Sequence, residues 1–328
     1  DDAAHIDSIH AAGLPFYPLP LRQHGTNPLQ EITAARAIYA LYRQLRPDIV
    51  HQVTIKAVLY GGMAARLVRI PAVVNAVTGL GYVFTEQGAK ATLLRAGSSA
   101  AYRLALNHPN SLTIFQNPDD MAQFIDYGLL PSECAVLIKG SGVDMDEFQP
   151  QPEPDGPPVV LYAGRLLWPK GIGEFVEAAR LLRAEDINAR FAIVGYGEPG
   201  SPMNVPPETL AGWAAEGIIE LWGRRSDMPQ VYAAAHIICL PSYYREGIPR
   251  VLIEAGACGR AVVAADVSGC NEIVQDGENG LLVPPRDAPA LARALRRLIE
   301  DDDLRRRMGA RGRVIAQEGY SFARVASE

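Results

Sequence analysis

Two glutamates stand eight positions apart in the stretch EGIPRVLIEA, one before a predicted helix start and one inside the helix. If that helix begins near 247–249, the helical rise places Glu246 and Glu254 about 10–12 Å apart. The carboxylate pairs of glycosidases lie closer together, at about 5–5.5 Å or about 6.5–9.5 Å. The spacing therefore argues against a hydrolytic acid–base pair.

The same spacing fits the length of a nucleotide-sugar, with a hexose at one end, a ribose at the other and a diphosphate between them. An ionised carboxylate accepts two hydrogen bonds from a diol, which suits hydroxyl recognition. Gly247 would allow close backbone approach, and the helix N-terminus would face the phosphates. The alternative is a surface glutamate and a helix-interior glutamate without a joint role.

A second candidate lies in AGRLLWPKGIGEFVEAA (163–179), where a predicted strand leads into an amphipathic helix. Arg165 follows the strand, and Lys170 stands just before the helix. Two cations beside the positive end of a helix dipole suit a diphosphate. Loop cations without a shared role are the plainer interpretation.

Two further motifs are weaker. GYGEPG (195–200) matches the glycine pattern of dinucleotide-binding turns, but the helix that such a turn must open is prevented by four prolines between 199 and 207. We expect Gly195 and Gly197 to mark a ligand-facing loop at the carboxyl end of a strand. In DMD (144–146) the aspartates are expected to cap a short helix after a glycine turn rather than to hold a metal.

The elements that must position these residues alternate along the chain. The predicted strands are 48–53, 72–77, 112–116, 159–164, 190–195, 218–223, 236–241 and 261–266, and helical patterns include 28–46, 172–184 and 288–301. Such alternation indicates parallel sheets covered by helices on both faces. The stretch FQPQPEPDGPP (148–158) has five prolines in eleven residues, which predicts a linker between two domains.

Charge and composition limit the classes of partner. A net charge of −6 argues against nucleic acid as the main partner. The interval 49–118 is nonetheless basic, with six cationic residues and one acidic one. We predict that it contacts anionic lipid or a polyanionic substrate. The alternative is a solvated face with no such partner. The four cysteines show no metal-binding spacing and are expected to be reduced. No apolar run approaches the length of a membrane span.

Taken together, these motifs resemble the family 4 retaining glycosyltransferases of the GT-B fold. The matching segments cover nearly all of residues 140–300, among them GSGVDMDEFQP, LYAGRLLWPKGIGEFVEAARLL and the stretch from LWGRRSDMPQ to LLVPPRD. The resemblance implies two Rossmann-like parallel-sheet α/β domains with a cleft between them. Residues 1–148 would form the acceptor-side domain, 149–158 the linker and 159–328 the nucleotide-sugar-binding domain.

Three N-terminal segments resemble a narrower bacterial group: PDIVHQVTIKA, VTGLGYVF and FQNPDDMAQFIDYGLL. Those enzymes extend O-antigen, capsule or lipid-linked glycans on a polyprenyl-diphosphate carrier, often with UDP-N-acetylhexosamine donors. The resemblance therefore implies a cytoplasmic enzyme, peripheral on the inner face of the membrane, with a nucleotide-sugar donor and a glycan or polyprenyl-diphosphate-linked acceptor.

The resemblance also assigns roles to single residues. Glu254 would hold the ribose hydroxyls, while Arg165 and Lys170 would hold the diphosphate. Glu246 would hold the hydroxyls of the donor sugar, together with the backbone of 247–248.

The backbone contact to the sugar is expected from Gly247 and Ile248. The base would be bordered by Arg224, which follows Gly223, and by the loop of Gly195 and Gly197. The family transfers with retention and normally without metal, so that Arg165, Lys170 and Glu246 would carry catalysis with no cofactor besides the donor, which is expected to be a UDP-sugar. Front-face attack would follow, with the leaving phosphate helping to deprotonate the acceptor.

The sequence departs from the family in two ways. Many relatives carry a histidine where this chain has Thr78 and Gly79, and His51 is the nearest alternative. Relatives also begin with a strand, a glycine-rich loop and a helix, and their last helix is longer, so we expect those segments to be missing from this sequence.

Two rival functions use the same fold and ligand. One is a nucleotide-sugar epimerase or hydrolase, and the other is a nucleotide-sugar-binding protein without catalysis. Release of UDP only in the presence of a glycosyl acceptor would separate transfer from both.

Overall fold

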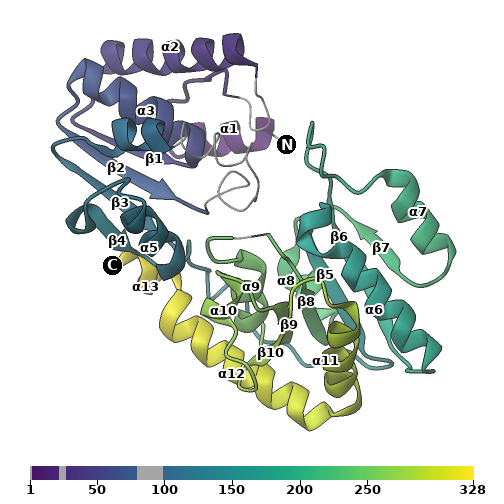
Figure 1. The fold of residues 1–328 in the computed structure, drawn as a ribbon. Coiled ribbons are helices and arrows are strands. Elements are labelled where there is room, and N and C mark those ends of the chain that lie inside the picture. Colours follow the sequence, from purple (N-terminus) through teal and green to yellow (C-terminus); the bar gives the residue numbers. More distant parts are fainter. Residues whose placement is uncertain (1, 22–26, 80–98, 245) are drawn as a thin grey trace.

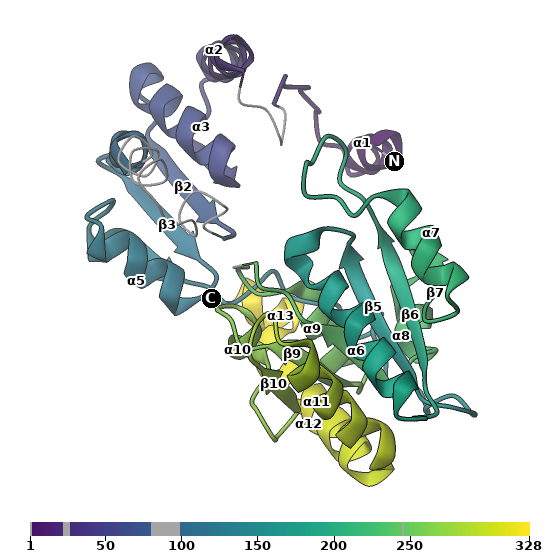
Figure 2. The ribbon, with the colours of Figure 1, turned by 45° about the vertical axis from the view of Figure 1, so that its right-hand side comes forward.

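The computed structural model describes residues 2–21, 27–79, 99–244 and 246–328. They form two parallel-sheet α/β domains, one at each end of the molecule, which Figures 1 and 2 show as separate lobes. This arrangement confirms the predicted fold class.

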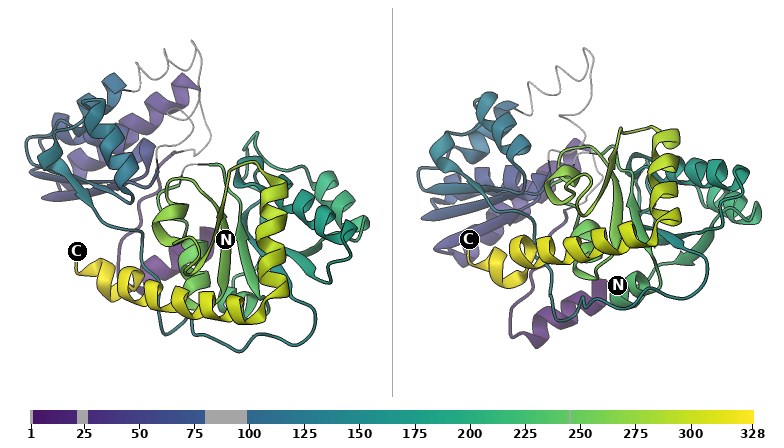
Figure 3. Two further views of the ribbon diagram at one scale, coloured as in Figure 1. Left: turned by 60° about the horizontal axis from the view of Figure 1, so that its bottom comes forward. Right: turned by 90° about the horizontal axis from the view of Figure 1, so that it is seen from below.

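The N-terminal lobe contains a four-stranded parallel sheet with the strand order β1-β2-β3-β4. Its strands are β1 Ile49–Val53, β2 Ala72–Val77, β3 Ser111–Phe115 and β4 Ala135–Leu137. Its helices are α2 Pro28–Leu45, α3 Ile55–Val68, a helix over 99–106, α5 Pro118–Asp126 and the 3-10 turn η2 Ser132–Cys134. The first helix, α1 Asp2–Ala11, lies apart from these, on the side of the C-terminal lobe (Figures 2 and 3).

The C-terminal lobe contains a six-stranded parallel sheet with the order β10-β9-β8-β5-β6-β7. Its strands are β5 Val159–Arg165, β6 Arg190–Tyr196, β7 Glu220–Gly223, β8 Ile237–Leu240, β9 Ala261–Ala265 and β10 Gly280–Val283. Its helices are η3 Trp168–Lys170, α6 Ile172–Ala184, α7 Pro207–Ala215, α8 Met228–Ala233, α9 Arg250–Ala257, α10 Cys270–Ile273, α11 Ala288–Glu300, α12 Asp302–Tyr320 and α13 Phe322–Ala326. The chain builds outward from β5 to β7 and then returns to place β8 on the other side of β5. Ligands of open α/β sheets bind at such a switch in strand order.

The two sheets differ in how they are covered. The C-terminal sheet has one apolar core beneath α6 and α11 and another beneath α8, α9 and α12. In the N-terminal lobe, α2, α3, the helix over 99–106 and α5 pack on the sheet face that carries Val73 and Val77. The opposite face leaves Ile49 63% and Leu112 47% exposed, so the expected cover on both faces is incomplete within the described residues.

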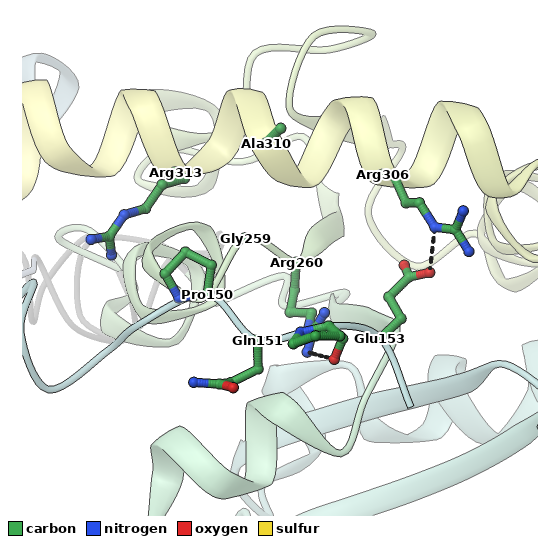
Figure 4. Close-up of a pocket in the computed structure, with 9 residues that line it drawn as sticks. Pro150, Gln151, Glu153, Gly259, Arg260, Arg306, Ala310 and Arg313 are labelled. Atoms are coloured by element: carbon green, nitrogen blue, oxygen red, sulfur yellow. Dashed lines mark hydrogen bonds and ion pairs between the residues drawn. The ribbon is translucent and has the colours of Figure 1, made fainter. Parts of the chain in front are cut away.

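The proline-rich stretch is fastened to the C-terminal lobe. Arg305 of α12 donates two hydrogen bonds to Glu153, and Arg306 donates one. Arg260 donates to the carbonyl of Pro152. A hollow of about 540 Å³ lies between the stretch and α12. Figure 4 shows Glu153, Arg260 and Arg306 around it. The linker is therefore a strap along one lobe.

The chain just before this strap also belongs to the C-terminal lobe. Val143 and Phe148 are buried in the core beneath α9 and α12. Val143 pairs with Ser321, at the point where α12 gives way to α13. Figure 3 shows α12 running across this lobe toward the chain end.

The free thiols are consistent with the expected reduced state. Cys239, Cys258 and Cys270 are buried, and Cys134 is partly buried. Burial raises the pKa of Cys258 to about 12, so this thiol stays protonated at neutral pH.

Candidate active site

The candidate site is built where β5 and β8 end side by side, at the switch in strand order. The carbonyl of Pro169, in the turn after β5, accepts hydrogen bonds from the amides of Tyr243 and Tyr244, after β8. Gly171 has φ +76°, and a Cβ there would lie 2.0 Å from the carbonyl oxygen of Pro241. Only glycine therefore lets the two turns approach this closely.

This approach brings Lys170 against Glu246. The Lys170 Nζ lies 2.5 Å from Glu246 Oε1, and both side chains are largely buried. The ammonium group also lies 5.7 Å from the ring centroid of Tyr244. The residue expected to bind the diphosphate, Lys170, thus lies next to the residue expected to bind the sugar, Glu246.

Arg165 is held by a partner that sequence reasoning missed. Both carboxylate oxygens of Glu198 lie 2.9 Å from Arg165 Nη1, and the Glu198 side chain is only 7% exposed. Asn204 fixes the backbone of Glu198 by one hydrogen bond in each direction. In the part of the chain that is described, Nε and Nη2 of Arg165 have no hydrogen-bond partner, so they remain available to an anion.

Glu254 occupies the first turns of α9 and is nearly buried. Its Oε2 accepts a hydrogen bond of 2.8 Å from the Tyr232 hydroxyl, and its Oε1 accepts one of 2.7 Å from Arg250 Nε. Burial raises the pKa of Glu254 above its ordinary value, although the bonds from Tyr232 and Arg250 oppose that shift. Two fixed donors thus orient a carboxylate that can accept further bonds from a diol.

The residues expected beside the base lie at the ends of β6 and β7. The guanidinium carbon of Arg224 is 4.5 Å from the ring centroid of Tyr196, which is half-exposed. Gly195 is the last residue but one of β6, and Gly197 opens the loop that Asn204 closes. The side chain of Ile248 is buried in the core beneath α9, so only its backbone can face a ligand.

The residues predicted on the acceptor side, Thr78, Gly79 and His51, differ in how close they lie to the site. A Cβ on Gly247 would lie 2.9 Å from the carbonyl oxygen of Thr78, so the backbone of Thr78 reaches the loop that carries Gly247. No described contact joins Gly79 to that loop. His51 is exposed within β1, where its strand partner is Val74, and no described contact joins it to Glu246 or Gly247. The structure brings Thr78 to the site and does not bring His51 there.

The other acidic motif has a local role. Asp144 Oδ1 accepts hydrogen bonds from the amides of Asp146 and Glu147, which closes a turn. Among the described residues, no group of three or more His, Cys, Asp or Glu side chains is arranged to hold a metal ion.

Comparison with known proteins places the chain in a family. Residues 157–301 match the model of the glycosyl transferases group 1, and residues 2–117 match that of glycosyl transferase 4-like domains. A Campylobacter jejuni N,N'-diacetylbacillosaminyl-diphospho-undecaprenol alpha-1,3-N-acetylgalactosaminyltransferase is 32% identical over 92% of this chain and 81% of its own length. The chain belongs to the group 1 glycosyltransferases.

Other known proteins resemble this glycosyltransferase over most of its length. An Escherichia coli UDP-Gal:alpha-D-GlcNAc-diphosphoundecaprenol alpha-1,3-galactosyltransferase is 25% identical over 83% of this chain and 72% of its own length. The solved structure of Anabaena HepE in complex with UDP and glucose matches with a TM-score of 0.78 at 22% identity, over 98% of this chain and 86% of that one. The latter likeness shows that the two lobes form a GT-B fold. In the described part of this glycosyltransferase, no helix combines the length and the apolar character that a membrane span requires.

Proposed function

We propose that this glycosyltransferase moves a hexose or N-acetylhexosamine from a UDP-sugar to a glycan carried on a polyprenyl diphosphate. The observation that carries the proposal is the contact of Lys170 with Glu246 at the switch in strand order. It sets a phosphate-binding cation beside a sugar-binding carboxylate, as the bond between sugar and diphosphate requires. The two relatives named for diphospho-undecaprenol-linked acceptors support the choice of acceptor.

The donor would lie across the carboxyl ends of the C-terminal strands. Glu254 accepts hydrogen bonds from the ribose, and Arg165 and Lys170 hold the diphosphate. Glu246 and the backbone of 247–248 grip the sugar hydroxyls. As the bond to the sugar breaks, negative charge grows on the diphosphate, and the two cations stabilise it in place.

We propose that transfer retains the anomeric configuration and needs no metal. The two cations supply the charge that a divalent ion supplies to a diphosphate elsewhere. Front-face attack follows, in which the leaving phosphate accepts the proton of the acceptor hydroxyl. The anomer of the product, assigned by NMR, and turnover in excess EDTA test these two features separately.

The N-terminal lobe would carry the acceptor, and the C-terminal lobe the donor. The N-terminal lobe also offers a surface for peripheral contact with an anionic membrane. On α2, Leu29 is 75% exposed and Ile32 53% exposed, and Arg36 and Arg43 are exposed further along the helix. Apolar and cationic side chains on one helix suit the lipid headgroup boundary.

The basic interval 49–118 contributes less to that surface than its composition suggests. Lys56 forms an ion pair of 2.7 Å with Glu31. Arg66 and Arg103 donate hydrogen bonds to backbone carbonyls of the same lobe. Lys90 and Arg95 lie outside the described residues. Co-sedimentation with phosphatidylglycerol vesicles, compared with neutral phosphatidylcholine vesicles, tests the contact.

The deciding experiment measures UDP release from a panel of UDP-sugars with and without an undecaprenyl-diphosphate-linked glycan. Transfer predicts release that depends on the acceptor, and it predicts large losses for Glu246→Ala and Lys170→Ala. Release without acceptor would favour a hydrolase. Binding without release would favour a nucleotide-sugar-binding protein.

A further inference from the structure

We infer that Asn117 is the positioning residue through which the N-terminal lobe fixes the sugar-recognition loop of Glu246 and Gly247. The inference rests on the proposed role of Glu246 in gripping the donor sugar. It adds a residue of the opposite lobe that fixes the position of the loop that carries Glu246.

Asn117 is fully buried, and its side-chain amide spans the two lobes. Its Nδ2 lies 3.1 Å from the carbonyl oxygen of Glu246 and 3.2 Å from that of Gly247. Its Oδ1 accepts a hydrogen bond of 3.3 Å from the hydroxyl of Ser268, also in the C-terminal lobe. One side chain thus meets the sugar-recognition loop and the loop behind it.

The N-terminal lobe holds this amide rigidly. Asn117 is the N-cap of α5, and its Oδ1 accepts a hydrogen bond of 2.8 Å from the amide of Asp120. The Asp120 carboxylate, itself buried, accepts a bond of 3.0 Å from Asn117 Nδ2. Pro118 at the first helical position fixes the backbone direction. The cap leaves one amide hydrogen to be shared between the two carbonyls across the interface.

Two glycines make this approach sterically feasible. A Cβ on Gly247 would lie 1.9 Å from Gln116 Oε1, the side chain next to Asn117. On the far side, a Cβ on Gly269 would lie 2.4 Å from the carbonyl oxygen of Gly247 and 2.6 Å from that of Glu246. The sugar-recognition loop is therefore packed between 116–117 and 268–269, with its carbonyls in one orientation.

The energetic consequence is a coupling between lobe contact and sugar binding. A buried donor or acceptor left without a partner costs about 1–3 kcal/mol, and three such groups meet here. If the donor binds only when the loop is in this position, donor binding also favours the contact of Asn117 with the carbonyls of Glu246 and Gly247. UDP alone, held by Glu254, Arg165 and Lys170 of one lobe, does not depend on it.

The test compares Asn117→Asp with wild type. The aspartate keeps the oxygen that caps α5 but replaces the amide donor with an acceptor that faces two carbonyls. We expect kcat/KM for the UDP-sugar that serves as donor to fall about 10- to 100-fold, the size of a lost buried donor. The dissociation constant for UDP, measured by calorimetry, should stay within twofold. Backbone amides 246–252 should exchange hydrogen faster.

Asn110→Asp is the matched control, because Asn110 lies in the same lobe and its amide donates only to the exposed carbonyl of Pro71. It should leave all three quantities unchanged. If Asn117→Asp does not fold, Asn117→Ser replaces it, since serine also caps helices but is too short to reach both carbonyls.

Three outcomes would overturn the inference. One is an Asn117→Asp enzyme with wild-type kcat/KM, and another is unchanged amide exchange in 246–252. The third is a loss of UDP affinity equal to the loss in kcat/KM, which would indicate general damage. A wild-type chain that transfers no UDP-sugar would instead refute the proposed function and this inference with it.

Discussion

Lys170 and Glu246, far apart in the sequence, form a largely buried ion pair of 2.5 Å at the meeting point of two strand ends. The cation that we propose for the diphosphate and the carboxylate that we propose for the sugar therefore neutralise each other in this structure. On that proposal a donor separates them, with the diphosphate binding Lys170 and the sugar hydroxyls binding Glu246. The pair keeps both groups in place and desolvated until that exchange.

Glu246→Gln should separate nucleotide binding from transfer. Loss of the carboxylate leaves Lys170 unpaired, so we expect UDP to bind a few-fold more tightly, while kcat/KM for transfer falls by about 100-fold or more, as for a lost charge-assisted contact to substrate. Calorimetry with UDP and steady-state rates provide the two readouts. Weaker UDP binding would mean that the pair does not compete with the diphosphate.

Glu254 should make donor affinity sensitive to mild acid. Burial raises the pKa of its carboxyl, so the side chain takes up a proton at a higher pH than an ordinary glutamate with its value near 4.5. Protonation removes acceptor capacity at the ribose, so affinity falls as the pH drops toward that raised pKa. An intact UDP-sugar is the right ligand, because its diphosphate does not titrate in this range. Glu254→Gln should bind weakly at every pH, and a variant that kept the wild-type pH profile would contradict the assignment.

Glu198→Ala should weaken the diphosphate clamp through Arg165. Without Glu198 the guanidinium, already about one-third exposed, loses its fixed orientation. We expect about a tenfold rise in KM for the donor, in line with a lost hydrogen bond to a charged group, and Glu198→Gln should restore most of it. Glu216→Ala, which removes an exposed partner of Arg180, is the control and should change nothing. Tighter donor binding by Glu198→Ala would show that Glu198 competes with the diphosphate instead.

Gly171→Ala should lower both stability and activity. Alanine in the left-handed region costs about 1–2 kcal/mol, and its Cβ would press on the Pro241 carbonyl. Gly277→Ala is matched in φ, at +79°, but has open space around the added carbon. Thermal melts should therefore separate the two variants, with Gly171→Ala lower in Tm and Lys170 displaced from Glu246. Equal melting temperatures would show that the turn yields without cost.

Glu153 should make stability fall in acid. Burial alone would raise its pKa, but the hydrogen bonds from Arg305 and Arg306 and the charges of Arg305 and His236 lower the pKa overall. A carboxyl with a lowered folded pKa stabilises the fold above its unfolded pKa, near 4.5, and that stability is lost as the pH drops through the folded pKa. Urea unfolding between pH 3 and pH 6 should show this slope in wild type and a flatter one in Glu153→Gln. If stability fell with pH equally steeply in wild type and in Glu153→Gln, the acid sensitivity would come from other groups.

Much of the fold follows from local sequence pattern. The helix predicted over 172–184 forms at those residues, and each of the eight predicted strands is present within two residues at its ends. The missed strands, Ala135–Leu137 and Gly280–Val283, are three and four residues long. The three residues of the first are too few for a pattern. The second is as long as β7 and β8, which were predicted, and it lies at the edge of its sheet, where it is paired with β9.

Residues of the candidate site could be selected from the sequence where a charged side chain stands close to a predicted strand end or helix start. Arg165, Lys170, Glu246 and Glu254 each stand next to a strand end or a helix start. Glu198 and Asn117 could not be found in this way, because their partners are distant in sequence and the contacts arise only when loops and lobes meet. The best available signal for Asn117 was its place before Pro118, which predicts a helix cap and nothing more.

The strap along the C-terminal lobe bears on how the molecule opens. Val143, Phe148 and Glu153 all belong to that lobe, and Ile138 is still bonded to Phe115, so the chain passes from the N-terminal sheet to the C-terminal lobe over Lys139–Gly142. Five Cα steps span at most about 17 Å, and both glycines in the crossing have left-handed φ angles, +75° and +72°. At this crossing the two lobes are held together by a short tether, which limits how far they can separate. On the proposed function, an acceptor held at a bilayer would therefore stay within a short reach of the donor-binding lobe.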